Sequence, residues 1–152
     1  MSDSSPSTAA DQEVLITGTF EAPRERVFTA WIDPDEVAAW YGPAHFDTPR
    51  DRIRIDPRVG GRYELTMVQR DGGAEFPVGY DIVELVEPQL LVLRSDPIPE
   101  IGMHEPTITR VEFHEDGTGT RMTLKDGPYP GGGSHAAAGW KAAFDKLGAL
   151  VD

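Results

Sequence analysis

The clearest hydrophobic pattern lies at the end of the chain, where apolar residues recur at helical spacing. We expect a helix from Ser134, whose side chain suits the N-cap position, to the last residue. Its apolar positions follow the spacing of a single helix face. They are Trp140, Ala143, Phe144, Leu147, Leu150 and Val151. An amphipathic helix of this kind must cover another apolar layer.

The segment from Phe20 to Pro43 predicts two short helices separated by a proline. Pro23 suits a first helical position, since its missing N–H would be unpaired there anyway. Asp33-Pro34 ends the first helix because a residue before proline avoids the α region, and it also begins a capping signal for the second. Gly42-Pro43 then ends the second helix.

Most of the remaining chain alternates between apolar and polar residues, which is typical of half-buried strands. Tight turns at Asp71-Gly72 and Asp116-Gly117 join some of these strands, so their neighbours run antiparallel. Residues 96–106 are expected to form an irregular loop, and residues 126–133 a flexible link. We expect strands over residues 13–20, 52–56, 62–67, 78–86, 90–94, 107–115 and 118–125.

This order of elements predicts an α+β fold. A curved antiparallel sheet of about six to seven strands has one apolar face, and the C-terminal helix is the large apolar surface left to cover it. We therefore expect the sheet to wrap around that helix, with Trp140 and Phe144 turned inward. The two short helices after the first strand close one end of the sheet.

Length and composition predict one domain over residues 13–152, preceded by a disordered polar tail over residues 1–12. Lys plus Arg number 14 against 26 Asp plus Glu, and the net charge of -12 disfavours nucleic acid and anionic membranes as partners. The chain has no cysteine, which excludes disulfides and thiol catalysis. It also has no apolar run long enough for membrane insertion and no signal-peptide pattern, so we expect a cytoplasmic protein.

No catalytic or metal-binding motif is present in the sequence. The four histidines form neither an HxH nor an HExxH arrangement, and there is no GxSxG elbow, so we assign no catalytic residue, no metal and no cofactor. His45 and the pair His104-Glu105 are alternatives for acid–base chemistry, or they are ordinary loop residues. Arginines at positions 50, 52, 54, 58 and 62 indicate either an anion-binding strip or a salt-bridged sheet exterior.

A set of turn and core residues carries a family resemblance. With these residues the chain resembles the START-like (SRPBCC, helix-grip) superfamily, and within it bacterial proteins related to the activator of heat-shock-protein ATPase. The resemblance covers about residues 13–152 and implies the helix-grip fold. The matching positions are Ala22-Pro23-Arg24, Val27-Phe28, Ala30-Trp31, Asp33-Pro34, Trp40, Gly42-Pro43, Asp56, Gly60-Gly61, Gly79-Tyr80, Glu87-Pro88, Leu90, Gly119-Thr120-Arg121 and Trp140.

The resemblance also implies a hydrophobic cavity between the sheet and the long helix, where family members bind lipids, sterols, polyketides or other apolar molecules. Gly139 and Gly148, inside the terminal helix, would leave room for a ligand or allow close packing. Residues like those we expect at the cavity belong more often to an ordinary packed core than to a pocket wall, because protein interiors pack with few voids. Strand parity and helix face select Trp31, Trp40, Tyr63, Leu65, Met67, Tyr80, Val111, Phe113, Met122, Trp140 and Phe144 as its lining.

Three functions remain open at this point. The first is non-catalytic binding of a small hydrophobic molecule in the cavity, with that molecule as the principal partner. The second, implied by the resemblance, is a co-chaperone or protein-interaction domain whose partner is a chaperone. The third is an enzyme of the cyclase or dehydratase type, using His or Asp/Glu at the cavity mouth. The sequence favours the first function.

Overall fold

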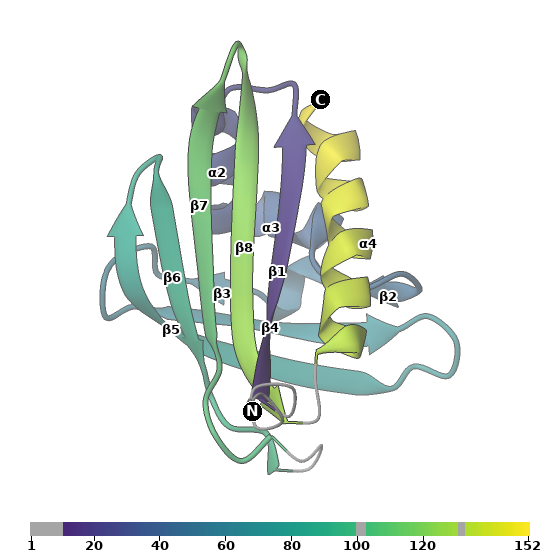
Figure 1. Cartoon of the computed structure of the whole chain (residues 1–152). Coiled ribbons are helices and arrows are strands. Elements are labelled where there is room, and N and C mark those ends of the chain that lie inside the picture. Colours follow the sequence, from purple (N-terminus) through teal and green to yellow (C-terminus); the bar gives the residue numbers. More distant parts are fainter. Residues whose placement is uncertain (1–10, 100–102, 131–132) are drawn as a thin grey trace.

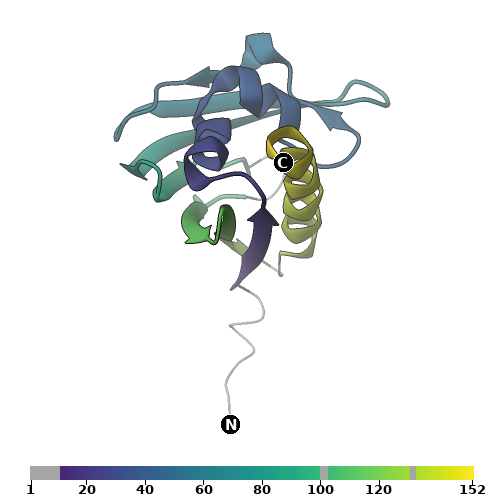
Figure 2. The same cartoon turned by 90° about the horizontal axis from the view of Figure 1, so that it is seen from above.

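The computed structural model describes residues 11–99, 103–130 and 133–152. An antiparallel sheet curls around the long C-terminal helix, and two short helices cover one end (Figure 1). Seen from above, the sheet wraps the helices on several sides (Figure 2). The elements are β1 (Asp11–Phe20), α2 (Arg24–Ile32), α3 (Pro34–Trp40), β2 (Phe46–Asp47), the 3-10 turn η1 (Arg50–Arg52), β3 (Arg54–Ile55), β4 (Arg62–Gln69), β5 (Glu75–Val86), β6 (Leu90–Ser95), β7 (Ile108–Asp116), β8 (Gly119–Pro130) and α4 (Ser134–Val151).

Within the described residues, the sheet has eight strands in the order β1-β8-β7-β6-β5-β4-β2, with β3 also paired to β4. Every pairing is antiparallel. The predicted α+β helix-grip fold is therefore confirmed. One strand was not predicted from the hydrophobic pattern. It is β2, which has two residues and pairs with β4.

The core lies between the concave face of the sheet and the apolar stripe of α4. Leu147 is fully buried, and the Phe144 ring packs against Phe20 of β1 with 6.3 Å between ring centroids. Trp31 of α2 lies between two other tryptophans, stacked on Trp140 at 5.8 Å and edge-on to Trp40 at 4.6 Å. The three helices thus share one aromatic cluster against the sheet, as the sequence predicted for Trp140 and Phe144.

The helix starts differ in detail from the predictions. Asp33 caps α3 as expected, because its side chain accepts a hydrogen bond from the Asp35 N–H at 2.9 Å. Pro23 is the N-cap of α2 instead of its first residue. Ser134 is likewise the first residue of α4, with Gly133 at the N-cap and no side-chain cap bond.

One strand prediction and the link prediction were wrong in part. Residues 50–52 form a 3-10 turn, so only Arg54–Ile55 of the expected strand over 52–56 pairs with β4. The expected flexible link from residue 126 is instead the last part of β8 as far as Pro130. It stays in the sheet because Asp126 has backbone partners on both sides, Thr109 of β7 and Val14 of β1.

The predicted tail and part of the link fall largely outside the described residues. Positions 1–10, 131 and 132 are not described, whereas Asp11 and Gln12 belong to β1. Among the described residues, no helix is both long and apolar enough to cross a membrane.

Candidate functional site

A pocket of about 220 Å³ opens between the first half of α4 and the concave face of the sheet. We call it the α4 pocket. The turn after α3, strands β4, β5 and β8, the end of β6, the loop after it and α4 all contribute to its wall. Its described lining consists of Tyr41, Gly42, Pro43, Met67, Val78, Tyr80, Ser95, Asp96, Ile98, Met103, Thr107, Asp126, Tyr129, His135, Ala136, Gly139, Trp140 and Ala143.

A buried carboxylate lies at one end of this pocket. Asp126 of β8 is only 2% exposed and accepts hydrogen bonds from the Thr109 hydroxyl and the Trp140 indole N–H, both at 2.8 Å. The Tyr129 hydroxyl donates a third hydrogen bond to it. These donors come from β7, α4 and β8. Three hydrogen bonds of this kind stabilise a carboxylate away from water.

Two tyrosines form a hydroxyl pair on the same pocket wall. The hydroxyl oxygens of Tyr41 and Tyr80 lie 2.6 Å apart, and both side chains are buried. Burial raises the pKa of Tyr41 and of Tyr80 above the ordinary value, and the negative charge of Asp126 raises both further. The pair therefore stays neutral at physiological pH.

This hydroxyl pair can donate one hydrogen bond to a guest. Two hydroxyls carry two hydrogens, and the bond between Tyr41 and Tyr80 uses one of them. The α4 pocket therefore combines an apolar wall with a neutral donor and, beside it, the carboxylate of Asp126. Such a set of groups suits binding and orientation of a molecule.

Three of the residues predicted to line the cavity, Met67, Tyr80 and Trp140, line the α4 pocket. Phe144 instead faces a second hollow, between α4 and β1. The other seven predicted residues are buried at 2% exposure or less and lie outside the α4 pocket lining. They are Trp31, Trp40, Tyr63, Leu65, Val111, Phe113 and Met122.

Satisfied polar groups explain why several of these seven side chains pack in the core. The Tyr63 hydroxyl donates to the Trp31 carbonyl oxygen, and the Trp40 indole N–H donates to the Ala30 carbonyl oxygen at 2.8 Å. The Trp31 indole N–H contacts the Met122 sulfur at 3.3 Å. None of these donors is left to orient a guest.

Sequence reasoning missed the polar end of the pocket. Asp126 and Tyr129 lie in a segment rich in glycine and proline, which was interpreted as a link. One signal could have found Asp126. It continues the alternation of Met122 and Leu124, which share its parity and are buried on the same face of β8. Tyr41, at the C-cap of α3, was not among the residues selected for the lining.

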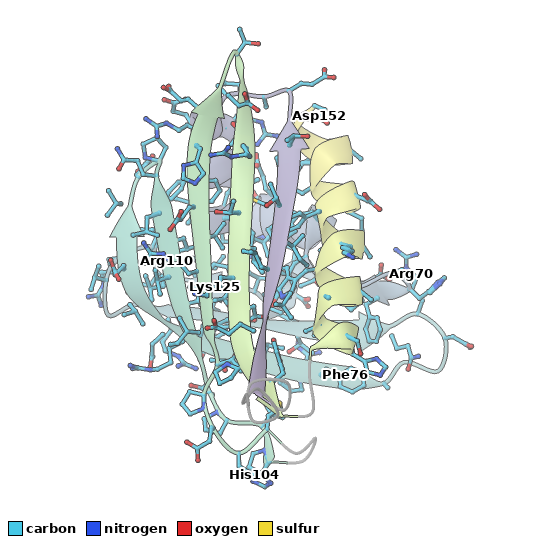
Figure 3. All side chains as sticks on the ribbon, in the orientation of Figure 1. Arg70, Phe76, His104, Arg110, Lys125 and Asp152 are labelled. Atoms are coloured by element: carbon cyan, nitrogen blue, oxygen red, sulfur yellow. The ribbon has the colours of Figure 1, made fainter. Side chains whose placement is uncertain are left out.

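The histidines considered for acid–base chemistry do not lie at this pocket. His45 and His104 are exposed and absent from the described pocket lining, and His104 projects from the loop end of the molecule (Figure 3). His135 is exposed at the pocket rim. Within residues 11–99, 103–130 and 133–152, no group of three His, Asp or Glu side chains is arranged to hold a metal ion.

The arginine-rich segment is mostly neutralised by carboxylates. Arg50 pairs with Asp35, and Arg52 pairs with Glu75 at 3.0 Å. Arg62 makes ion pairs with Glu64, Asp81 and Asp96, the last at 2.6 Å. These contacts favour the salt-bridged exterior over an anion-binding strip, and they attach Asp96 at the pocket rim to β4.

A curled antiparallel sheet closed over a long C-terminal helix, with a pocket between them, defines the START-like or helix-grip class of proteins. This protein is of that class. Residues 21–152 match the model of the family described as Activator of Hsp90 ATPase homolog 1-like protein, and the chain belongs to this family.

Solved structures from several bacteria share the fold. A protein from Chromobacterium violaceum is similar at 23% identity and a TM-score of 0.82, over 92% of this chain and 97% of that chain. An AHSA1-like protein from Aeromonas hydrophila is similar at 25% identity and a TM-score of 0.73, over 92% of each chain. CalU16 from Micromonospora echinospora is similar at 20% identity and a TM-score of 0.68, over 93% of this chain and 77% of that chain. No curated protein matches this sequence.

Proposed function

We propose that this protein binds a small, mainly apolar molecule in the α4 pocket and does not transform it. The observation that carries the proposal is the pocket itself. Apolar side chains form most of its wall, and its buried polar groups gather around Asp126 and the tyrosine pair. Concave apolar sites with a few convergent polar groups are the usual form of small-molecule sites.

The size of the pocket limits the class of ligand. Its volume of about 220 Å³ lies just below the roughly 300–1,000 Å³ of common ligand pockets. A compact molecule with a single ring system suits this space better than a sterol or a polyketide. Met67, Met103 and Ile98 line the wall, and flexible side chains such as methionine adapt to the shape of a guest.

A pair of glycine variants in α4 tests the proposal. Gly139 lines the pocket, and a Cβ atom there would lie 3.5 Å from the ring of Pro43, another lining residue. We expect Gly139→Leu to fill part of the pocket. Gly148 lies about two and a half turns further along the same helix, where a Cβ atom would face Phe20 and Asp152 instead. Gly148→Leu is therefore the matched control.

The measurement is a thermal melt of each protein with a panel of single-ring compounds, together with native mass spectrometry of the freshly purified chain. A compound present at about 100 times its Kd should raise the Tm of the native protein and of Gly148→Leu by about 5–10 °C. Gly139→Leu should lose this shift. Equal shifts in all three proteins, or no shift with any compound, would contradict the proposal.

The family match supports a second candidate function, that of a chaperone partner. The family is described by likeness to an activator of Hsp90 ATPase, and the match covers residues 21–152. Under this hypothesis, adding the protein to an Hsp90-type chaperone raises its rate of ATP hydrolysis. Gly139→Leu should activate as well as the native chain if the α4 pocket plays no part. An unchanged rate of ATP hydrolysis would remove this candidate.

A further inference from the structure

Asp126 is a buried carboxylate beside an apolar pocket, and its charge is not balanced by a neighbouring cation. Within the part of the chain that the structure describes, it forms no ion pair with a Lys, Arg or His side chain. Its three partners, Thr109, Tyr129 and Trp140, are neutral donors. A buried charge without a counter-ion is unusual, because desolvation of the charge is costly.

The rest of the pocket lining does not supply the missing positive charge. No Lys or Arg is among its described residues, and the one basic side chain is His135, exposed at the rim. The other acidic residue, Asp96, is already paired with Arg62 at 2.6 Å. Asp126 is therefore the unbalanced charge among the described lining residues, and it disfavours a carboxylate or phosphate on a guest.

The pKa of Tyr129, a residue of the pocket lining, also reflects the negative charge of Asp126. The pKa of Tyr129 is raised first by burial and then by the charge of Asp126. The charge of Asp126 thus opposes ionisation of the Tyr129 phenol, which would place a second negative charge beside the carboxylate. A fatty-acid carboxylate in the pocket would meet the same opposition.

Asp126 also retains capacity to bind a donor. A carboxylate has about four lone-pair positions, and protein donors occupy three of them. Aromatic rings of Tyr41, Tyr80 and Trp140 line the same pocket, with the Tyr41 and Trp140 centroids 5.7 Å apart. Ring faces attract cations, and a carboxylate among aromatic rings favours an organic ammonium group.

We propose that the ligand of the α4 pocket is a small lipophilic amine, bound in its protonated form with the ammonium group at Asp126 and the apolar body against Met67, Val78 and Ala143. The inference rests on the proposed function of the pocket as a ligand site. It specifies the charge of the ligand and the residue that recognises that charge.

The variant Asp126→Asn tests the effect of the charge alone, because it removes the negative charge and can keep the hydrogen bonds. The Asn carbonyl oxygen can take the place of the carboxylate oxygen that accepts from Tyr129 and Trp140, and its amide N–H can then donate to the Thr109 hydroxyl. All three contacts are kept while the charge is lost. Asp81→Asn is the matched control, because it removes a carboxylate that is paired with Arg62 and Arg94 and lies outside the described lining of the α4 pocket.

The test measures Kd by calorimetry at pH 7 for three probes that share one ring and differ in the polar group. These are cyclohexylmethylamine, cyclohexylmethanol and cyclohexanecarboxylic acid. We expect the native protein to bind the amine about ten- to a hundredfold more tightly than the alcohol, which is the range of a charged hydrogen bond, and the acid more weakly than the alcohol. Asp126→Asn should bring the Kd of the amine to the level of the alcohol, whereas Asp81→Asn should keep the preference for the amine.

The outcomes separate this inference from the function on which it rests. Equal Kd values for amine and alcohol in the native protein, or tightest binding of the acid, overturn the amine inference and leave the pocket as a ligand site. Absence of binding by all three probes overturns both. If Asp126→Asn does not fold, the three Kd values on the native protein, with Gly139→Leu as the blocked pocket, still decide the question.

Discussion

Asp126 joins three elements through its side chain, since its donors belong to β7, β8 and α4. The carboxylate therefore has a structural role whether or not a guest is bound. Thr109, the fully buried donor at 1% exposure, cannot turn to water if it loses this acceptor.

We predict that Asp126→Ala lowers the free energy of unfolding by about 3 kcal/mol, because the buried Thr109 hydroxyl is left without an acceptor and the half-buried Tyr129 and Trp140 donors lose theirs. Asp126→Asn, which can keep these bonds, should lose less than half as much. Urea denaturation at pH 7 measures both. An Asp126→Ala variant as stable as the native protein would contradict the hydrogen-bond network.

The four tyrosines yield a prediction about alkaline pH. Burial raises the pKa of Tyr41, Tyr63, Tyr80 and Tyr129 above the value near 10 that an unfolded chain has. The neutral phenols therefore contribute stability that is fully present below pH 10 and is lost as the pH rises through the folded-state pKa. Phenolate absorbance should rise together with the loss of circular dichroism, and a phenolate signal from the still folded protein would show that burial is incomplete.

Individual side chains were predicted from the sequence only where their direction follows from local periodicity. Strand parity and helix face correctly turned Tyr63 and Trp140 inward. They could not distinguish a pocket wall from packed core. That difference depends on which partners fill the adjoining space, as Phe113 and Met122 do around Trp31.

At the scale of elements, the glycine pair before β4 depends on close backbone contact. A Cβ atom at Gly61 would lie 2.1 Å from the Asp56 carbonyl oxygen and 2.9 Å from that of Arg58. Gly60 has a φ of +84° but open space around it. The two neighbouring glycines are thus needed for different reasons.

We predict that Gly61→Ala costs about 3 kcal/mol of stability, because backbone atoms must move to accept the methyl group. Gly60→Ala should cost about 1 kcal/mol, the penalty for a left-handed backbone with a side chain. Guanidinium unfolding curves of the two variants give the comparison. Similar losses of stability in both variants would mean that the backbone of the turn near Asp56 can shift at little cost.

Elements were predictable to the extent that their signals were local. The stripe of α4 and the Asp33 cap of α3 are properties of neighbouring residues, and both are confirmed. The end of β8 could not be predicted from the sequence, because its glycine and prolines favour a loop. Pairing with β1 and β7 keeps Asp126 in the sheet. Contacts between distant strands decided that element.

At the scale of the whole molecule, a single core connects the sheet to all three helices. The tryptophans at positions 31, 40 and 140 come from α2, α3 and α4 and pack together. Charged side chains such as Arg110 and Lys125 point away from this core on the outer face of the sheet (Figure 3). The molecule offers no second core that could remain folded by itself within its described residues.

We predict that the protein unfolds in one cooperative transition. Tryptophan fluorescence reports the packing of the helices, and far-ultraviolet circular dichroism reports the backbone of sheet and helices. Their midpoints in urea should coincide. A fluorescence change at lower urea would show that the helices detach before the sheet unfolds.

The overall topology could be predicted because turn residues and the family resemblance both indicate it. The candidate site could not be predicted from the sequence, because the side chains of the α4 pocket come together only after the sheet has curled. Tyr41 and Tyr80 lie 39 positions apart in the chain, and their hydroxyl contact has no local signature.

The scattered origin of the α4 pocket wall, from Tyr41 near the start to Ala143 near the end, has a practical consequence. No fragment of the chain holds enough of the wall to recognise anything, so an occupant can associate only with molecules that have completed folding. Any compound that enters will then act as a pharmacological chaperone. The supply of such a compound would set how many copies of the protein escape proteolysis, and the abundance of the protein would become a readout of that compound.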